Sequence, residues 1–280
     1  MKICIRAHDL GVKGTEGILT SLKRLEIDGV QMVCYKAYDD IPYKPGAITP
    51  EKAKAIAAAF SDAGAQIPLI GAYFNPVHSN PEKVSTCKEI FAEYLKVANL
   101  MGCGVVGSET GSFNDDKWTY HPRNRTEEAL QTVVSTFSEL CDIGADAGSV
   151  VAMEGAAGHV CFDVDTLDRA QRMMNRPNTR VIFDLYNYLD ESNQGDYIRI
   201  LEKGLDVFGD RILLFHMKDC EFVSGQKPKQ VAFGTGQMDL HKILGLIKAH
   251  DKNAVLTLEG TTGADIAHAV KTIRTIWERV

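Results

Sequence analysis

Short runs of β-branched and other apolar residues alternate along the whole chain with longer segments in which apolar residues recur every three or four positions. The short runs predict eight strands, near residues 2–7, 29–35, 66–72, 103–108, 149–154, 180–184, 211–217 and 254–259. The longer segments predict eight helices, near 15–26, 50–63, 81–101, 125–147, 164–175, 194–207, 239–249 and 262–278. Several of these helices start at a recognisable cap, such as Thr49 before Pro50, Thr126 followed by Glu128, or Asp239.

Strands that alternate with helices, with no signal for an antiparallel hairpin, predict parallel pairing and a sheet covered on both faces. Eight such units in 280 residues favour a closed α/β (β/α)8 TIM barrel over an open doubly wound sheet. An open sheet that binds dinucleotides needs a Gly-x-Gly-x-x-Gly turn after its first strand, and residues 6–11 instead read Arg-Ala-His-Asp-Leu-Gly. No break in composition divides the chain, so we expect one domain over residues 1–280.

Composition narrows the class of protein. The chain is 45% hydrophobic and 24% charged, which is typical of a globular domain. A net charge of −6 argues against a nucleic-acid partner, because proteins that bind many phosphates normally carry a basic face. No apolar run is long enough for a membrane span and no signal peptide is evident, so we expect a cytoplasmic protein. The seven cysteines include no Cys-x-x-Cys pair and are interpreted as reduced core residues. The sequence does not determine the oligomeric state, and a homo-oligomer is possible.

Each of the last four predicted strands ends in an ionisable residue. The four residues are Glu154, Asp184, His216 and Glu259. Any one of them alone could be a helix cap or a solvated strand end. Their spacing is about one strand–helix unit, however, and the carboxyl ends of barrel strands meet at one mouth, which is where function gathers. We therefore expect these four side chains to converge.

Converging carboxylates repel one another in a poorly solvated pocket, and a bound cation is the usual way to keep them ionised together. Three carboxylates and one imidazole suit a single divalent ion, Mn²⁺, Mg²⁺, Co²⁺ or Zn²⁺, better than a thiol-seeking metal. The sequence does not choose among these ions, and a metal-free polar cluster is the alternative interpretation.

Two motifs resemble those of the sugar isomerase/epimerase superfamily, also described as xylose isomerase-like barrels. Residues 215–219, Phe-His-Met-Lys-Asp, are similar to its His-x-Lys-Asp strand end, and residues 234–239, Gly-Thr-Gly-Gln-Met-Asp, to its Gly-x-Gly-x-x-Asp loop. The superfamily includes ketose 3-epimerases, hydroxypyruvate isomerase, inosose dehydratase and, more distantly, endonuclease IV. By position, the resemblance implies metal-ligand roles for all four strand-end residues, and acid/base roles for Glu154 and Glu259.

The chain departs from the ketose 3-epimerases at two positions that orient substrate oxygens in those enzymes. Asn187 stands where they have a histidine three residues after the ligand aspartate, and the arginine shortly after their ligand histidine is not evident. The resemblance therefore does not imply epimerisation of free ketohexoses. Endonuclease IV fits less well, because its three-zinc site needs more histidines than these strand ends offer.

The site and the resemblance together predict a metal-dependent isomerase or epimerase that acts on a small sugar, a sugar phosphate or a related hydroxy-carbonyl compound. One glutamate would remove a proton next to the carbonyl, and a donor such as Lys218 would stabilise the enediolate. An inosose-type dehydratase is the nearest alternative. An endonuclease IV-like nuclease and a sugar-binding barrel without turnover are more distant ones.

Other polar residues at predicted strand ends are candidates for substrate binding. Strand alternation points Arg6 and His8 into the barrel, although a buried histidine of purely structural role fits equally well. Glu109 ends the fourth strand facing inward, with a helix-capping or loop role as its alternative. Tyr73, with Asn75 beside it, follows the third strand, and Asn187 and Lys218 follow the sixth and seventh.

Two long connections also carry cationic and aromatic residues. Residues 112–125 include Trp118 and Arg125, and residues 219–238 include Lys227 and Lys229. Either connection could close over a substrate and meet a phosphate group, while ordinary surface charge is the simpler interpretation. Glycine-rich phosphate cradles are missing, which leaves open whether the substrate is phosphorylated.

Overall fold

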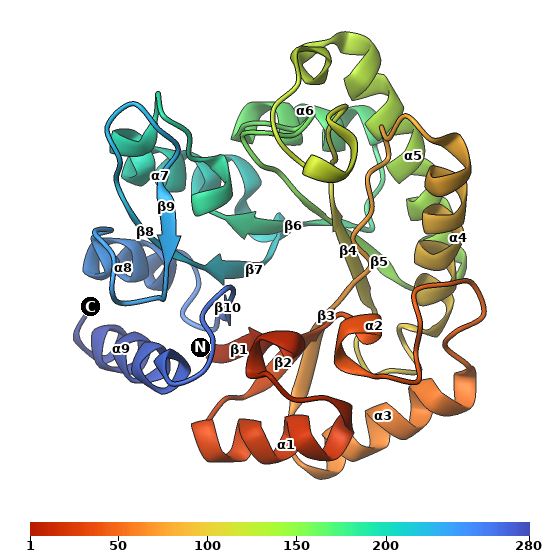
Figure 1. Ribbon diagram of the computed structural model, residues 1–280, viewed down its shortest axis with the longest axis horizontal. Coiled ribbons are helices and arrows are strands. Elements are labelled where there is room, and N and C mark those ends of the chain that lie inside the picture. The colour runs from red at the N-terminus through yellow and green to blue at the C-terminus, as the bar shows by residue number, and fades with distance from the viewer.

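Eight parallel strands close into a barrel in a computed structural model that describes residues 1–280. The order around the barrel is β1-β10-β7-β6-β5-β4-β3-β2, with β1 paired to both β10 and β2 (Figure 1). The strands are β1 (Lys2–Arg6), β2 (Gly29–Met32), β3 (Gln66–Gly71), β4 (Val105–Glu109), β5 (Val150–Glu154), β6 (Thr179–Asp184), β7 (Ile212–Met217) and β10 (Val255–Leu258). The predicted (β/α)8 TIM barrel is confirmed.

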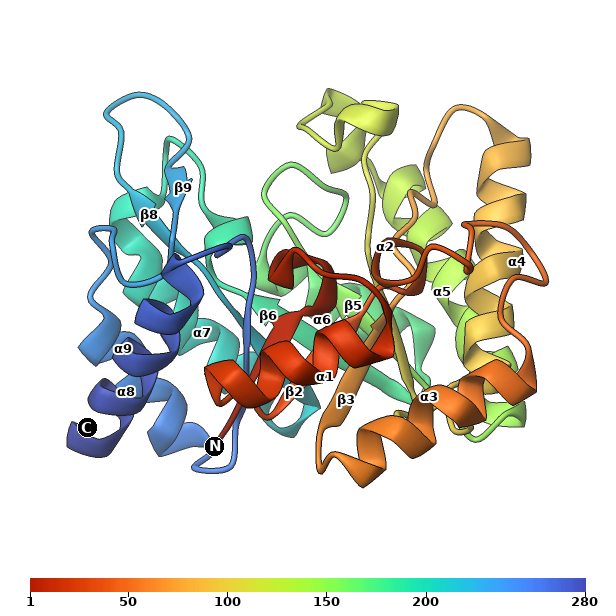
Figure 2. The ribbon, with the colours of Figure 1, turned by 60° about the horizontal axis from the view of Figure 1, so that its bottom comes forward.

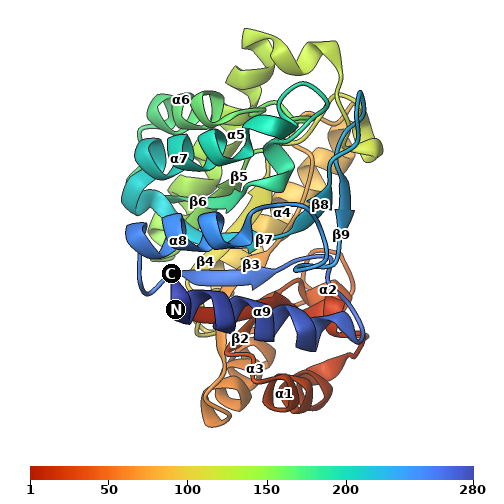
Figure 3. The same cartoon turned by 90° about the vertical axis from the view of Figure 1, so that its left-hand side faces the viewer.

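Helices surround the barrel and cover the outer faces of its strands (Figures 1 and 3). They are α1 (Gly14–Leu25), α2 (Cys34–Ala37), α3 (Pro50–Asp62), α4 (Pro81–Val97), α5 (Glu127–Asp146), α6 (Val164–Met174), α7 (Tyr197–Phe208), α8 (Leu240–His250) and α9 (Asp265–Arg279). Short 3₁₀ turns lie in the connections: η1 (Ala7–Leu10), η2 (Asp115–Lys117), η3 (Pro122–Arg125), η4 (Tyr186–Tyr188), η5 (Gln194–Asp196) and η6 (Gly209–Arg211). None of the helices combines the length and the apolar character that crossing a membrane requires.

Helix α5 shows why these segments are helical. The Thr126 hydroxyl caps it by accepting a hydrogen bond from the backbone N–H of Ala129, as its sequence predicts. Its apolar residues fall on one face and are buried, and Phe137 packs edge-on against Phe91 of α4 at a centroid distance of 6.5 Å. Burying this apolar stripe against the strands and the neighbouring helix stabilises α5 in its place.

The inside of the barrel is built in layers. Leu69, Ala152, Ile182 and Leu214 form a separate buried cluster there. A side chain on Gly107 of β4 would run into three members of this cluster, so position 107 also faces inward. Successive residues of a strand point to opposite faces, so the residue two positions further on also faces the interior. On β4, β5, β6 and β7 those residues are Glu109, Glu154, Asp184 and His216, all at the carboxyl end of the barrel.

Two details of the sequence-based prediction are wrong. The strand expected over 29–35 ends at Met32, because the chain turns into the short helix α2 at Cys34. An antiparallel hairpin, β8 (Asp219–Glu221) with β9 (Lys229–Val231), is also present where a plain connection was expected. Its strands are three residues each, too short to show an alternating pattern. Figure 2 shows the hairpin rising from the same side of the barrel as the loop after β4.

The seven cysteines are all unpaired, and six of them are buried while Cys103 is partly exposed. They are distributed over strands, helices and loops and do not gather into a cluster that could hold a metal ion. This agrees with their interpretation as core residues.

Candidate metal centre

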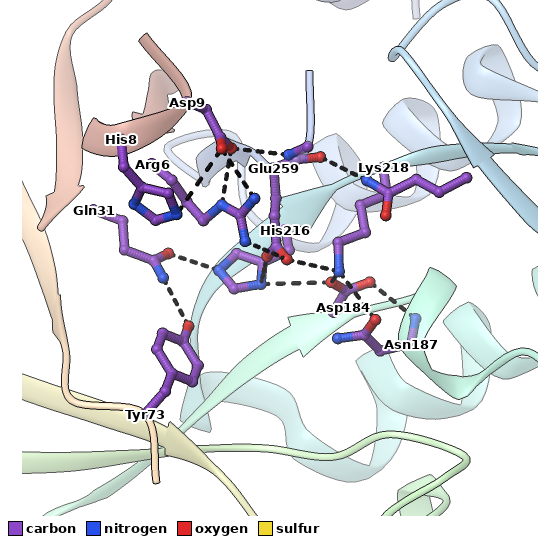
Figure 4. Close-up of polar contacts among 12 residues, drawn as sticks. Arg6, His8, Asp9, Gln31, Tyr73, Asp184, Asn187, His216, Lys218 and Glu259 are labelled. Carbon is purple, nitrogen blue, oxygen red and sulfur yellow. Dashed lines mark hydrogen bonds and ion pairs between the residues drawn. The ribbon is translucent and has the colours of Figure 1, made fainter. Parts of the chain in front are cut away.

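The four residues predicted to converge do so at the carboxyl-terminal mouth of the barrel. Each of Glu154, Asp184, His216 and Glu259 offers one ligand atom, and these atoms all lie within 4.8 Å of one another. Three of the residues are buried and Glu259, one residue beyond β10, is slightly exposed. Figure 4 shows Asp184, His216 and Glu259 pointing toward a common point.

The imidazole of His216 is held in one orientation by partners on both sides. Nδ1 faces the carboxylates, 2.9 Å from Glu259 Oε2, 3.3 Å from Glu154 Oε1 and 3.5 Å from Asp184 Oδ2. Nε2 lies 2.7 Å from the amide oxygen of Gln31 on β2. Nδ1 is therefore the nitrogen that faces the candidate ligands, while Nε2 is turned to Gln31.

Glu259 lies against two cations. Arg6 Nη1 donates to Glu259 Oε1 at 2.9 Å, and the rest of the guanidinium donates to both carboxylate oxygens of Asp9. Asp9 Oδ2 also accepts the backbone N–H of Gly260 at 2.9 Å, so Asp9 holds both Arg6 and the residue after Glu259. The Lys218 ammonium lies 2.9 Å from the same Glu259 oxygen.

Lys218 and Asn187 connect the other members of the group. Lys218 Nζ lies 2.8 Å from Asp184 Oδ2 and donates to Asn187 Oδ1 at 3.0 Å. The Asn187 amide in turn donates to Glu154 Oε1 at 2.7 Å, and its backbone N–H donates to Asp184 Oδ1 at 3.0 Å. Asn187 and Lys218, both predicted to contact substrate, therefore lie in direct contact with the candidate ligands.

The surroundings shift the pKa values of the two glutamates in opposite directions. Burial raises the pKa of Glu154, and Glu259 and Asp184 add to this, although His216 opposes it. Burial also acts to raise the pKa of Glu259, but Lys218, His216 and Arg6 outweigh it and hold this pKa well below the ordinary range. Burial disfavours the imidazolium of His216, yet the carboxylates around it raise the pKa of His216 well above 6.5.

The residues present fit one divalent cation. Three carboxylates and a histidine nitrogen are a donor set that such ions accept. Asp184 Oδ2 is buried, and it forms an ion pair with the Lys218 ammonium but no hydrogen bond of good geometry. This oxygen therefore has a lone pair that could coordinate a cation. Three carboxylates also crowd around Nδ1 of His216, and a cation at that point would balance their negative charge.

A cavity of about 400 Å³ opens beside the candidate ligands. Glu154 and Glu259 line its inner end, and aromatic residues, among them Tyr73 and Trp118, line its walls. Volume and lining are those of a small-molecule pocket. The predicted substrate-binding residues His8, Tyr73 and Glu109 all face this cavity, His8 from the turn η1 that follows β1.

Tyr73 also contacts residues of the candidate metal centre. Its hydroxyl accepts a hydrogen bond from Gln31 Nε2 at 2.7 Å and lies 3.4 Å from Glu154 Oε2. Figure 4 shows Gln31 between His216 and Tyr73. Through the Tyr73 hydroxyl, Gln31 is thus connected to Glu154 as well. Sequence reasoning missed Gln31 and Asp9; the alternation that places Gly29 and Gln31 on one face of β2 is the only signal that could have found Gln31.

The Glu109 carboxyl group makes no hydrogen bond or ion pair within the protein, and it faces the cavity. Burial, and then Glu154 beside it, raise its pKa to about 8. Asn75, in contrast, uses its amide inside the protein, where it binds the backbone of Val77, Ser112 and Asp115 and holds the loop after β4.

A family model described as xylose isomerase-like TIM barrel matches residues 19–276. The chain belongs to this family. The resemblance inferred from the motifs at 215–219 and 234–239 is thereby confirmed. In this xylose isomerase-like barrel both motifs meet at Asp219, whose carboxylate accepts the backbone N–H groups of Cys220, Gly234, Gly236 and Met238.

Solved structures of different activities share this xylose isomerase-like fold. A D-tagatose 3-epimerase-like protein is 18% identical with a TM-score of 0.78, over 100% of this chain and 98% of the other. The probable 3-DHS dehydratase AsbF from Bacillus anthracis is 13% identical with a TM-score of 0.75, over 98% and 99%. Endonuclease IV from Thermus thermophilus is 18% identical with a TM-score of 0.73, over 100% of both chains. A comparison with curated proteins finds no match.

Proposed function

We propose that the protein is a divalent-metal-dependent isomerase or epimerase that acts on a sugar, a sugar phosphate or a related small hydroxy-carbonyl compound. The observation that carries the proposal is the meeting of Glu154, Asp184, His216 and Glu259 around one point at the inner end of a cavity of about 400 Å³. The family and its sugar-acting relatives agree with this reaction class.

Glu154, Asp184, His216 and Glu259 would hold the ion. When bound, a divalent ion supplies Lewis acidity, which polarises a substrate carbonyl and acidifies the adjacent C–H bond. The remaining chemistry belongs to side chains of the chain.

The two glutamates are suited to opposite halves of a proton transfer. Arg6 and Lys218, each 2.9 Å from Glu259 Oε1, favour the ionised form of Glu259, so Glu259 is the group that we assign to removing the proton from carbon. Glu154 is the more deeply buried of the two glutamates and has no cationic side chain of Lys or Arg against it, so we assign to Glu154 the return of the proton. Lys218, with Asn187 beside it, donates hydrogen bonds to the oxygens of the enediolate.

The position to which the proton returns sets the reaction. Return to the opposite face of the same carbon inverts it, whereas return to the neighbouring carbon exchanges aldose and ketose. Both outcomes keep every oxygen of the substrate. The pocket residues Tyr73, His8 and Glu109 would orient the substrate for one of them.

Incubation of the Mn²⁺-loaded protein with ketoses, inososes and their phosphates in D₂O, followed by NMR, tests the proposal. We expect solvent deuterium at the carbon next to the carbonyl of at least one compound, without loss of water, and no incorporation by Glu259→Gln. A deoxy-dione product would instead show dehydration. Cleavage of DNA with abasic sites, falling steeply with salt, would show a nuclease and contradict the proposal.

A further inference from the structure

A second cavity, of about 420 Å³, adjoins the candidate metal centre. Glu109 and Trp118 line both cavities, so the two spaces meet at these residues. The walls of the second cavity come from the loops after β4, β5 and β6, the last of which includes Asn187, and from Lys227 of the β8–β9 hairpin. A substrate bound at the candidate metal centre can extend into this space.

Two cations line the second cavity without a carboxylate partner. Lys227, at the end of the hairpin turn, makes no hydrogen bond or ion pair, and its ammonium lies 5.4 Å from the centre of the Tyr186 ring. The Arg125 guanidinium donates to the carbonyl oxygens of His159 and Ala157, at 2.8 and 2.7 Å, and lies 3.6 Å from the centre of the Phe162 ring, but it forms no ion pair with a carboxylate. Lys229 and Arg123, in contrast, form ion pairs with Glu221 and Glu128. Lys117 of the loop after β4 forms no ion pair but does not line the cavity.

Acidic residues also line the second cavity, but none of them forms an ion pair with either cation. Asp190 accepts hydrogen bonds from Ser192 and from the backbone of Asn193. Glu109 and Glu191 line the same space and form no ion pair with Lys227 or Arg125. Neither cation is therefore held in an ion pair, although Glu109 and Asp190 lie near enough to Lys227 to favour its charged form.

The position of Lys227 is built into the fold. The Tyr186 hydroxyl donates to the carbonyl of Pro228, the next residue, at 2.9 Å. Gln194 Nε2 donates to the carbonyls of Val223 and Gln226 in the same turn, at 2.9 and 3.3 Å. Tyr186 also has Lys218 near its ring, at 5.6 Å, so one ring lies close to two lysines.

Lys227 is partly buried, forms no ion pair and lies near Lys218. Burial and the charge of Lys218 both disfavour its charged form, and they lower the pKa of Lys227. Keeping Lys227 charged in this place therefore costs free energy. An anionic group that binds Lys227 from the second cavity would offset that cost through charge-assisted hydrogen bonds. Such costly arrangements are typical of binding sites.

We propose that Lys227 and Arg125 form a subsite for an anionic group of the substrate, a carboxylate or a phosphoryl group. The subsite proposal rests on the proposed function in one respect: it takes the substrate to be a hydroxy-carbonyl compound. The substrate class is then a sugar acid or a sugar phosphate, whose reacting carbons lie at the candidate metal centre while its anionic end reaches the second cavity.

Isothermal titration of the Mn²⁺-loaded full-length protein with three ligands that differ only at carbon 6 tests this subsite. The ligands are D-fructose, its derivative with a carboxylate at carbon 6, and D-fructose 6-phosphate. We expect at least one anionic ligand to bind about tenfold or more tightly than D-fructose, the effect of one hydrogen bond between charged groups. The ligand that does so distinguishes carboxylate from phosphoryl recognition.

Lys227→Gln should abolish that preference and leave the affinity for D-fructose unchanged, while Lys229→Gln, from the same hairpin, should keep it. Equal affinity for all three ligands, no binding of either anion, or an equal loss for neutral and anionic ligands in Lys227→Gln would overturn the subsite. The two proposals can fail separately. If the protein prefers an anionic ligand through Lys227 but exchanges no deuterium into any compound, the subsite stands and the proposed function is refuted.

Discussion

The amide oxygen of Gln31 lies 2.7 Å from Nε2 of His216, and both side chains are buried. The Gln31 amide nitrogen donates to the Tyr73 hydroxyl, which identifies the amide oxygen as the acceptor and places the imidazole proton on Nε2. Nδ1 is then the lone-pair nitrogen when the imidazole is neutral, and it is the nitrogen that faces the carboxylates. Gln31 thus positions a candidate metal ligand without touching the ion.

Replacing Gln31 with leucine should weaken Mn²⁺ binding about 10- to 100-fold, the usual effect of removing a hydrogen-bond partner behind a ligand histidine. The affinity can be measured by isothermal titration. Gln131→Leu is the matched control, because Gln131 lies on the exposed face of α5 and binds only Glu127. An unchanged Mn²⁺ affinity in a folded Gln31→Leu protein would contradict this role.

Asp9→Ala should lower the free energy of unfolding by about 2 kcal/mol, because it removes the acceptor of two Arg6 guanidinium hydrogen bonds and of the Gly260 N–H, and leaves Arg6 with Glu259 alone. Urea denaturation measures the change. Asp40→Ala, which removes an exposed ion pair with Lys52, should leave the stability nearly unchanged. Equal effects of the two substitutions would show that Asp9 has no special structural role.

Gly236→Ala should destabilise the loop before α8. A methyl group at position 236 would overlap the Asp219 carboxylate, which accepts four backbone N–H groups there. Limited proteolysis should therefore cut this loop faster than in the wild type. Gly195→Ala is the control, since position 195 has open space around it; if both variants are cut at the wild-type rate, the close approach at Gly236 is wrong.

His159 should make the protein less stable in mild acid. Burial lowers the pKa of His159 to about 4, partly opposed by a hydrogen bond with the Trp118 backbone. Between pH 6.5 and 4 the unfolded chain binds a proton that the folded protein refuses, so stability falls as the pH falls through this window. Thermal unfolding at about pH 7, 6, 5 and 4 should show a smaller decrease for His159→Phe; parallel curves would mean that His159 does not contribute.

The barrel and the four converging residues could be predicted from the sequence because both follow from local regularities. Apolar runs of strand length alternate with helical periodicity over the whole chain, and the ends of barrel strands share one mouth. Glu154, Asp184 and His216 end their apolar runs, and the family motif marks His216 and Lys218. Glu109 faces inward as the alternation predicted.

The supporting residues could not be predicted, because their roles depend on contacts between distant segments. Gln31 and His216 are far apart in sequence and meet only through barrel closure. Asp9 lies in a 3₁₀ turn after β1, where no periodic pattern distinguishes it from a surface acid. Lys227 and Arg125 stand in loops, and only the structure separates them from Lys229 and Arg123, which are paired.

Metal binding tests the central claim most directly. Equilibrium dialysis against Mn²⁺, with metal analysis of the protein, should give one ion per chain. His216→Ala should weaken the binding about 100-fold by removing the only nitrogen donor of the set. No binding of Mn²⁺, Mg²⁺, Co²⁺ or Zn²⁺ by the wild-type protein, or equal affinity in the folded variant, would contradict a metal centre built from Glu154, Asp184, His216 and Glu259.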